Sequence, residues 1–204
     1  ILMRFFKLKK NLKASVLIAN YNNQNFIDEC IRSLKNQSYK NIEIIFHDDS
    51  SKDNSVKIAS KYKNIKIIKN NIRGKNGSFN QIKAYERAFK KSTGEIIFFL
   101  DSDDFFFKTK IERIIDIFNS KDKINVIYDL PIYKFENEHV IKKNKKKFIN
   151  NFWPYIPPQS CISMRREFFK AIIRSTKFKK FPDIWMDFRF AIYLIYISKN
   201  YFIL

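Results

Sequence analysis

Three carboxylates stand within four consecutive residues, Asp101-Ser102-Asp103-Asp104, directly after the predicted strand Glu95–Leu100. Like charges held close together resist ionisation unless a cation neutralises them. On an extended segment the i, i+2 spacing puts the side chains of Asp101 and Asp103 on one side. Oxygen ligands of this kind suit Mg²⁺ or Mn²⁺. The motif predicts a metal site that bridges to a diphosphate, with Asp101, Asp103 and Asp104 as candidate ligands, although Asp104 alone also fits a helix cap.

Polar residues also follow two further predicted strands at the points where those strands end. They are Asn20 and Tyr21 after Ser15–Ala19, and Asp48 and Asp49 after Ile42–Phe46. In open parallel sheets ligands bind at the carboxyl ends of the strands, so we expect these groups to meet the acidic motif. Asp48 is a candidate acceptor for the N3–H of a uracil ring, with Tyr21 near the base. The alternative is structural, with Asp49 capping the next helix.

The elements that must position these residues alternate as short strands and helices, which is typical of parallel βαβ units. Strands are predicted at 15–19, 42–46, 65–68, 95–100, 124–128 and 160–164, and helices include 78–91, 110–118, 165–175 and 183–198. A hairpin turning near Asn137 and an aromatic, proline-rich loop at 151–158 interrupt this rhythm. The pattern predicts one α/β domain with a Rossmann-like, mostly parallel central sheet flanked by helices.

The net charge of the chain indicates which classes of molecule it could bind. The chain has 204 residues, 40 Lys and Arg against 20 Asp and Glu, and a net charge of +20. Such a charge attracts nucleic acid, anionic lipid headgroups or phosphorylated substrates, and it is equally consistent with a solvated lysine-rich surface. No nucleic-acid-binding module is visible, so nucleic acid is not an expected partner. Cys30 and Cys161 lie in apolar surroundings without a CxxC pattern, which indicates reduced core thiols.

The sequence shows no recognisable targeting signal, which predicts a cytoplasmic location. No apolar run approaches the ~18 residues of a membrane span, and the N-terminus lacks the apolar core of a signal peptide. The basic segment Arg4–Lys13 contains Phe5, Phe6 and Leu8. It predicts peripheral contact with anionic lipid at the inner membrane face. The chain opens on Ile1 and stops in the strand-like run Tyr201–Leu204, which suggests a piece of a longer protein.

Three motifs together resemble the family 2 glycosyltransferases of GT-A fold. They are Ser15-Val-Leu-Ile-Ala-Asn-Tyr-Asn22, Phe46-His-Asp-Asp-Ser-Ser-Lys-Asp53 and Gly94-Glu-Ile-Ile-Phe-Phe-Leu-Asp-Ser-Asp-Asp104. The resemblance runs from about Lys13 to Phe118. It implies an inverting transferase that uses a nucleotide sugar, commonly a UDP-sugar, with Mn²⁺ or Mg²⁺. A glycan or lipid-linked molecule is the implied acceptor, and cell-surface polysaccharide the implied product.

The matched positions imply roles for individual residues. Ala19 and Tyr21 would lie near the nucleoside, Asp48 on the base, and Asp101 and Asp103 at the ribose and metal. Asn20 and Ser102 belong to the same nucleotide-binding motifs. Ala19 and Asn20 depart from the usual proline and small hydroxyl residue, and the basic residue that faces the diphosphate stays open between Arg73, Lys75 and Lys83. Within one GT-A domain over 1–204, we expect a nucleotide-sugar half at about 13–128 and an acceptor half at about 129–204.

The segment Phe181-Pro-Asp-Ile-Trp-Met-Asp-Phe-Arg189 resembles the part of the family that supplies the general base. Asp183 has the better spacing to Arg189, but Pro182 stands where another acid is usual. Asp187 follows one turn later, on the predicted same helix face as Asp183. Each also fits an acid favoured at a helix start. We slightly favour Asp187, because it lies inside the predicted helix.

Two other function classes fit parts of the sequence. A nucleotidyltransferase also places carboxylates and metal on a Rossmann-like sheet, but it normally carries a glycine-rich phosphate loop near its N-terminus. The only glycines here are at positions 74, 77 and 94, and no G-x-G-x-x-G or P-loop pattern occurs. A basic nucleic-acid-binding domain predicts salt-dependent affinity for any duplex. A transferase instead predicts metal-dependent binding of UDP.

Overall fold

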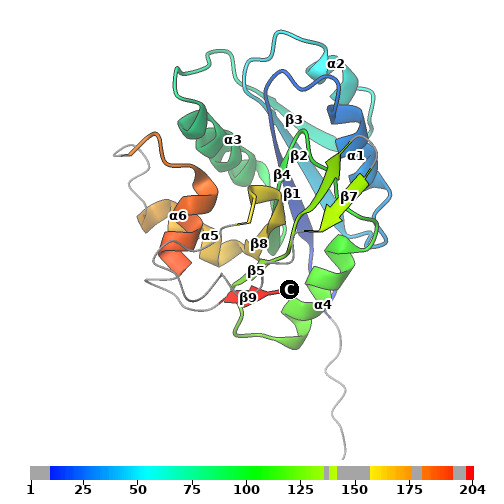
Figure 1. The fold of residues 1–204 in the computed structure, drawn as a ribbon, viewed down its shortest axis with the longest axis vertical. Coiled ribbons are helices and arrows are strands. Elements are labelled where there is room, and N and C mark those ends of the chain that lie inside the picture. The colour runs from blue at the N-terminus through cyan, green and yellow to red at the C-terminus, as the bar shows by residue number, and fades with distance from the viewer. Residues whose placement is uncertain (1–9, 136–137, 142–156, 176–180, 195–200) are drawn as a thin grey trace, which may run out of the picture.

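The computed structural model describes residues 10–135, 138–141, 157–175, 181–194 and 201–204, and it is a three-layer α/β/α sandwich (Figure 1). The central sheet has, in spatial order, the strands β3 (Ile65–Lys69), β2 (Ile42–Asp48), β1 (Ala14–Asn20), β4 (Ile96–Asp101), β8 (Ile162–Arg165), β5 (Val126–Tyr128) and β9 (Tyr201–Ile203). Pairs β3–β2, β2–β1, β1–β4 and β5–β9 are parallel, whereas β8 runs antiparallel to both of its neighbours. The predicted mostly parallel sheet is confirmed.

Helices cover both faces of the sheet (Figure 1). One layer contains α1 (Ile27–Lys35), α2 (Ser55–Ala59) and α4 (Lys110–Ser120), and the other contains α3 (Gly77–Lys91), α5 (Arg166–Ser175) and α6 (Met186–Tyr193). A separate two-stranded ribbon, β6 (Ile132–Phe135) and β7 (Glu138–Ile141), stands off the main sheet, and a short 3₁₀ turn, η2 (Gln159–Cys161), precedes β8.

Each helix buries one apolar stripe against the sheet. In α1 the buried residues are Ile27, Cys30, Ile31 and Leu34. Their i, i+3, i+4, i+7 spacing is that of an amphipathic helix. Burying a large apolar side chain fully stabilises the fold by about 1.5–3 kcal/mol. The strands β1 and β4 are buried on both faces, and so their sequences are continuous apolar runs rather than alternating ones.

Gly94 allows the start of β4 to approach β1 closely. A methyl group added at this position would lie 2.5 Å from Ser15 Oγ and 2.7 Å from the carbonyl oxygen of Lys13. The Gly94 N–H also donates to Ser15 Oγ at 2.8 Å. β1 and β4 are parallel and carry their motifs at their carboxyl ends, where the register places Ala19 beside Asp101.

The start of α6 differs from the sequence prediction. The helix begins at Met186, after Trp185 in an extended conformation with ψ of 155°. Asp183 therefore lies outside the helix, and the prediction that it shares a helix face with Asp187 was wrong. The turn at Phe181 to Ile184 precedes the helix, held by a hydrogen bond from the Ile184 N–H to the Phe181 carbonyl.

Three sequence predictions fall outside the described residues. They concern most of the basic segment Arg4–Lys13, the hairpin turn near Asn137 and residues 151–156 of the aromatic loop. Among the residues that the structure describes, no helix is both long enough and apolar enough to cross a membrane.

Candidate nucleotide and metal site

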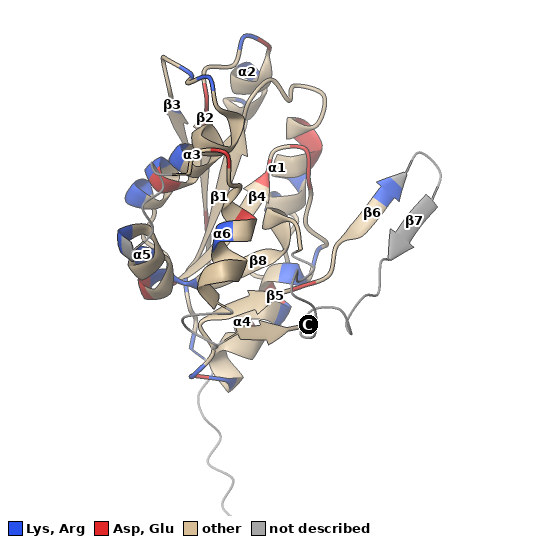
Figure 2. Cartoon of the chain, turned by 60° about the vertical axis from the view of Figure 1, so that its left-hand side comes forward, with Lys and Arg blue, Asp and Glu red and all other residues tan. Residues whose placement is uncertain are grey.

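A cavity of about 250 Å³ lies where β1 and β4 end, beside the start of α3. It brings together six of the predicted site residues, Ala19, Asn20, Tyr21, Asp101, Ser102 and Asp103. Its lining also includes residues that the sequence did not single out as ligands, Asn23, Asp49, Gly77, Asn80, Gln81, Ala84 and Trp185, and the earlier candidate Arg73. Asp48, Lys75, Lys83 and Asp104 are not among its lining residues. Acidic segments gather in this region (Figure 2), although the whole chain carries a charge of +20.

The loops after β1 and β2 are locked to each other. Asn20 Nδ2 donates to Asp48 Oδ1 at 2.8 Å and to Ser51 Oγ at 3.1 Å. The backbone N–H of Asn22 donates to the same Ser51 hydroxyl at 2.9 Å. Asn22 and Ser50 have positive φ angles of 52° and 67°, a conformation that non-glycine residues adopt only where their surroundings enforce it. This edge of the cavity is therefore preorganised.

Asp48 and Asp49 have different roles in the structure. Asp48 is buried, and its second oxygen accepts the Ser51 N–H at 3.0 Å, so both of its oxygens serve the fold. Asp49 lines the cavity, with Oδ1 bound by Asn70 Nδ2 at 2.8 Å. Asp49 Oδ2 is buried and makes no hydrogen bond of good geometry among the described residues, although Arg73 Nε lies 2.9 Å away as an ion pair. The Asp49 carboxylate is therefore a charge partner of Arg73 and a candidate acceptor for a ligand N–H.

Arg73 joins Asp49 to Tyr21. The Arg73 guanidinium carbon lies 3.6 Å from the centre of the Tyr21 ring, and Arg73 Nε lies 2.9 Å from Asp49 Oδ2 as an ion pair. A cation that lies over the face of an aromatic ring is attracted to that ring, and the attraction is stronger when the pair is shielded from water. Of the three basic residues left open by the sequence, only Arg73 lines the cavity. Lys75 is exposed, and Lys83 pairs with Glu86 at 2.7 Å.

Asp101 is held from behind by α3. Its Oδ1 accepts hydrogen bonds from Gln81 Nε2 at 2.9 Å and from the Tyr85 hydroxyl at 2.8 Å. Burial raises the pKa of Asp101 to about 7; the hydrogen bond from Tyr85 opposes this rise, and the charges of Asp104 and Asp103 add to it. Gln81 and Tyr85 are polar residues one helical turn apart, so their side chains lie on the same face of α3. This spacing is the feature of the sequence from which a common partner could have been predicted.

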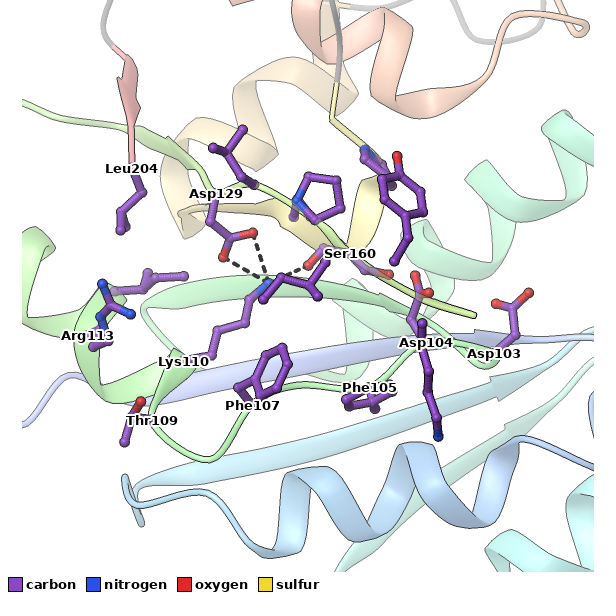
Figure 3. A pocket seen from close by; sticks show the side chains of 18 of the residues that line it. Asp103, Asp104, Phe105, Phe107, Thr109, Lys110, Arg113, Asp129, Ser160 and Leu204 are labelled. Carbon is purple, nitrogen blue, oxygen red and sulfur yellow. Dashed lines mark hydrogen bonds and ion pairs between the residues drawn. The ribbon is translucent and has the colours of Figure 1, made fainter. Parts of the chain in front are cut away.

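Asp104 interacts with Ser160 through a hydrogen bond and with Lys110 through its charge. The Ser160 hydroxyl accepts the Asp101 N–H at 3.0 Å, and the Ser160 carbonyl accepts Lys110 Nζ at 2.7 Å (Figure 3). Burial raises the pKa of Asp104; its hydrogen bond with Ser160 and the charge of Lys110 oppose the rise, while the charge of Asp103 adds to it. The carboxylates of the motif thus disfavour one another's ionised forms, which a cation would relieve.

The acidic motif suits a metal shared with a ligand. No three His, Cys, Asp or Glu side chains in the described part of the chain lie close enough to hold an ion by themselves. Mg²⁺ is commonly bound by one or two carboxylates, with phosphate oxygens and water completing its shell. Asp103 is exposed and borders the cavity, and Asp104 follows it directly. Their chemistry fits such an ion, whereas Asp101 is already committed to Gln81 and Tyr85 through one oxygen.

The two candidate bases lie in different surroundings. Asp183 is exposed, and its Oδ1 accepts a hydrogen bond from Asn76 Nδ2, beside Gly77 of the cavity wall. Asp187 lies in the first turn of α6, where burial raises its pKa although the Phe188 N–H, 2.7 Å away, opposes the rise. Burial is the main cause of the raised pKa of the Tyr128 phenol, and the negative charge of Asp187 adds to that rise. Asp183 is therefore exposed and joined to the residue before Gly77, whereas Asp187 is partly buried and interacts electrostatically with Tyr128.

Comparisons with known proteins agree with this geometry. The model of "Glycosyl transferase family 2" matches residues 15–186. An uncharacterised glycosyltransferase of Nostoc sp. (strain PCC 7120) is 29% identical over 195 residues, which are 86% of this chain and 57% of that protein. The Escherichia coli protein WfaP, a UDP-Glc:alpha-D-GlcNAc-diphosphoundecaprenol beta-1,3-glucosyltransferase, is 38% identical over 130 residues, 62% of this chain and 48% of that protein.

A solved structure confirms the fold. The structure of S. aureus TarS 1-349 in complex with UDP has a TM-score of 0.70 at 20% sequence identity. The alignment covers 95% of this chain and 58% of TarS 1-349. The predicted GT-A fold is therefore confirmed. This chain spans about half of the length of the curated relatives that it matches.

Proposed function

Because this chain belongs to glycosyl transferase family 2, we propose that it moves a sugar from a nucleotide-sugar donor, a UDP-sugar, to a hydroxyl of a glycan or lipid-linked acceptor. One observation carries the proposal: the cavity joins the Asp49 carboxylate, the Tyr21–Arg73 pair and the Asp103 carboxylate. These groups suit, respectively, a base N–H, a planar base and a metal-bound diphosphate. The UDP-dependent relative WfaP supports the choice of donor and of a lipid-linked acceptor.

The two halves of the chain cooperate at this site. Most of the cavity lining comes from residues before 129, in agreement with the proposed nucleotide-sugar half, but Trp185 belongs to the proposed acceptor half. Trp185 is 52% exposed and approaches Gly77. We place the donor sugar near this tryptophan, between the diphosphate position at Asp103 and the segment that carries Asp183.

Transfer with inversion requires one proton acceptor on the acceptor side. The acceptor hydroxyl oxygen attacks the anomeric carbon, the bond from that carbon to the diphosphate oxygen breaks, and a carboxylate takes the hydroxyl proton. We assign this role to Asp183, whose exposed carboxylate Asn76 orients by a hydrogen bond. Asp103 and Asp104 would hold Mn²⁺ or Mg²⁺, which neutralises charge on the departing diphosphate.

The metal assignment predicts linked binding. UDP should raise the melting temperature of the protein only when Mg²⁺ or Mn²⁺ is present, because Asp103 and the diphosphate share the ion. At 100 times Kd the ligand stabilises the native state by about 2.7 kcal/mol. Differential scanning fluorimetry with Mg²⁺ and with EDTA measures the difference. Asp103→Asn should remove the metal-dependent part of the shift, and equal shifts in both buffers would contradict the assignment.

Base recognition predicts a contrast between adjacent carboxylates. Asp49→Asn should weaken UDP binding by about 1–3 kcal/mol, because the base N–H loses its charged acceptor. CDP, whose cytosine lacks an N3–H, should lose much less affinity. Asp48→Asn should instead lower thermal stability, since both Asp48 oxygens bind neighbouring loops. Calorimetric titration of UDP and CDP into both variants is the measurement, and unchanged UDP affinity in a folded Asp49→Asn protein would rule out the contact.

The cellular location is also proposed. A lipid-linked acceptor places the working enzyme at the cytoplasmic face of the membrane, and the net charge of +20 favours anionic headgroups. The basic segment on which that contact was predicted lies largely outside the described residues.

A further inference from the structure

The acidic motif is supported by a residue from the second half of the chain. Ser160 lies in η2, 59 positions after Asp101, and is only 7% exposed. Its hydroxyl accepts the Asp101 N–H at 3.0 Å and donates a hydrogen bond to the Asp104 carboxylate. A serine hydroxyl has a single hydrogen to donate, and here that hydrogen is used on Asp104. Ser160 therefore joins the first and the last residue of the motif.

The main chain of the motif is held in a turn that does not by itself orient the Asp104 side chain. The Asp104 N–H donates to the Asp101 carbonyl at 3.0 Å, which closes the turn. The Ser102 N–H donates to the Ala19 carbonyl at 3.2 Å, which ties the turn to β1. Both bonds fix the course of the backbone. The hydrogen bond from Ser160 is what restricts the direction of the Asp104 carboxylate.

The direction of this carboxylate matters because Asp104 borders a different space from that of the nucleotide. A hollow of about 680 Å³ adjoins the nucleotide cavity; Asp104 lines only the hollow, whereas Asp103 lines both spaces. An ion shared by Asp103 and Asp104 would therefore lie at the junction of the two. Asp104 is half-buried, so without a neighbour that holds it the carboxylate would be free to turn into the hollow.

Ser160 itself is held in place by Lys110. Lys110 Nζ lies 2.7 Å from the Ser160 carbonyl oxygen and 2.9 Å from Asp129 Oδ2 (Figure 3). The Lys110–Asp129 pair is mostly shielded from solvent, and the ammonium lies 4.2 Å from the centre of the Phe106 ring. The Asp129 N–H donates to the Cys161 carbonyl at 2.9 Å. The turn η2 is thus bound both to α4 and to the segment after β5, so Ser160 meets the motif from a fixed position.

We propose that Ser160 is a positioning residue for the divalent ion, because its hydroxyl holds the Asp104 carboxylate in the orientation in which Asp104 and Asp103 share that ion. Groups that hydrogen-bond to metal ligands orient those ligands, and losing such a group typically weakens metal binding by about 10- to 100-fold. Ser160 does not line the nucleotide cavity, so it acts through Asp104 and not on the nucleotide. The inference rests on the proposed function, which places the ion at Asp103 and Asp104.

Titration of Mn²⁺ in the presence of excess UDP tests the inference without turnover. The electron paramagnetic resonance signal of free Mn²⁺ reports how much of the ion is bound. Ser160→Ala should raise the Kd of Mn²⁺ by about 10- to 100-fold. Ser160→Thr keeps the hydroxyl and should bind Mn²⁺ nearly as the unmodified protein does. At saturating Mn²⁺, Ser160→Ala should regain the UDP affinity of the unmodified protein, whereas a variant with a damaged fold would not.

Ser163→Ala is the matched control. Ser163 is a serine of β8 that is 1% exposed, and its hydroxyl donates to the Ile127 carbonyl at 3.4 Å rather than to the acidic motif. This variant should bind Mn²⁺ as the unmodified protein does. An unchanged Kd of Mn²⁺ in folded Ser160→Ala, or an equal rise in Ser163→Ala, would overturn the inference.

Amide hydrogen exchange in the unmodified protein carries the test if Ser160→Ala does not fold. The Asp101 N–H donates to Ser160, so its exchange rate reports on that bond. It should exchange more slowly with UDP and Mg²⁺ than with UDP and EDTA, because an ion on Asp104 immobilises the carboxylate to which Ser160 is joined. Equal exchange rates would overturn the inference. Failure of Mn²⁺ to bind the unmodified protein would instead overturn the metal assignment of the proposed function.

Discussion

Replacing Asp183 with asparagine is expected to lower the turnover number by roughly 10²- to 10⁴-fold, the usual contribution of a general base. The amide keeps the size of the side chain and an oxygen that accepts the Asn76 hydrogen bond, so the local structure should persist. UDP affinity should stay unchanged, because the base acts on the acceptor hydroxyl and not on the nucleotide. Release of UDP from the UDP-sugar in the presence of acceptor measures turnover, and calorimetry measures affinity.

Asp187→Asn is the matched control. Asp187 is partly buried, its pKa is raised by burial, and it lies in the first turn of α6. We expect its replacement to change stability modestly and turnover little. The opposite result, with Asp187→Asn inactive and Asp183→Asn active, would restore the assignment that the sequence slightly favoured. Full activity in both variants would place the base on neither residue.

Asp101→Asn is expected to stabilise the metal-free protein at neutral pH by about 2–4 kcal/mol. The folded-state pKa of Asp101 is about 7, against an ordinary value of 3.8, because burial outweighs the Tyr85 hydrogen bond and the other two carboxylates add to the rise. That difference corresponds to about 4 kcal/mol as an upper limit. Asparagine retains an oxygen for Gln81 and Tyr85 and carries no charge. The stabilised variant should nevertheless bind UDP and metal less tightly.

The direction in which stability changes with pH follows from proton binding by Asp101. Between about pH 4 and pH 7 the folded protein holds a proton on Asp101 that the unfolded chain has released. The free energy of unfolding therefore falls as the pH rises through this window, and the loss is complete above about pH 7. Urea unfolding in EDTA from pH 4.5 to 8 should show a smaller fall for Asp101→Asn than for the unmodified protein. Equal slopes would contradict the raised pKa.

Asp53 provides a control of opposite sign. Burial acts to raise its pKa, but hydrogen bonds from Ser55 and from the Gln24 backbone outweigh it and hold the pKa below the ordinary value. Its ionised form therefore stabilises the fold, and this contribution is lost only as the pH falls through the lowered pKa. Asp53→Asn should lower stability at neutral pH, whereas Asp101→Asn should raise it.

The sequence by itself determined the fold and the place of the site. The runs Val16–Ala19 and Ile96–Leu100 are apolar throughout because both faces of these strands are buried, and this pattern is visible without coordinates. A parallel sheet then brings the ends of its strands to one edge, so Tyr21 and Asp101 had to come close. Their order and spacing were enough to indicate the family.

Only the tertiary structure decided which of two neighbouring acids lies beside the cavity. Asp48 and Asp49 have the same chemistry and adjacent positions, but the turn after β2 commits Asp48 to the Asn20 and Ser51 loops and places Asp49 in the cavity lining. Asp183 and Asp187 also differ in their surroundings, because α6 begins at Met186, so that Asp187 lies in its first turn and Asp183 lies outside the helix. Side-chain direction in loops depends on contacts between distant segments, and local periodicity does not encode those contacts.

The same reason explains the support behind the acidic motif. Tyr85 meets Asp101 and Lys110 meets Asp129 through the packing of whole helices against the sheet. β6 approaches α1 through a hydrogen bond from Lys134 to Glu29, which are 105 positions apart. Residue types and their spacing establish the chemistry that is available, whereas long-range packing decides which groups share a surface and which of them a substrate can reach.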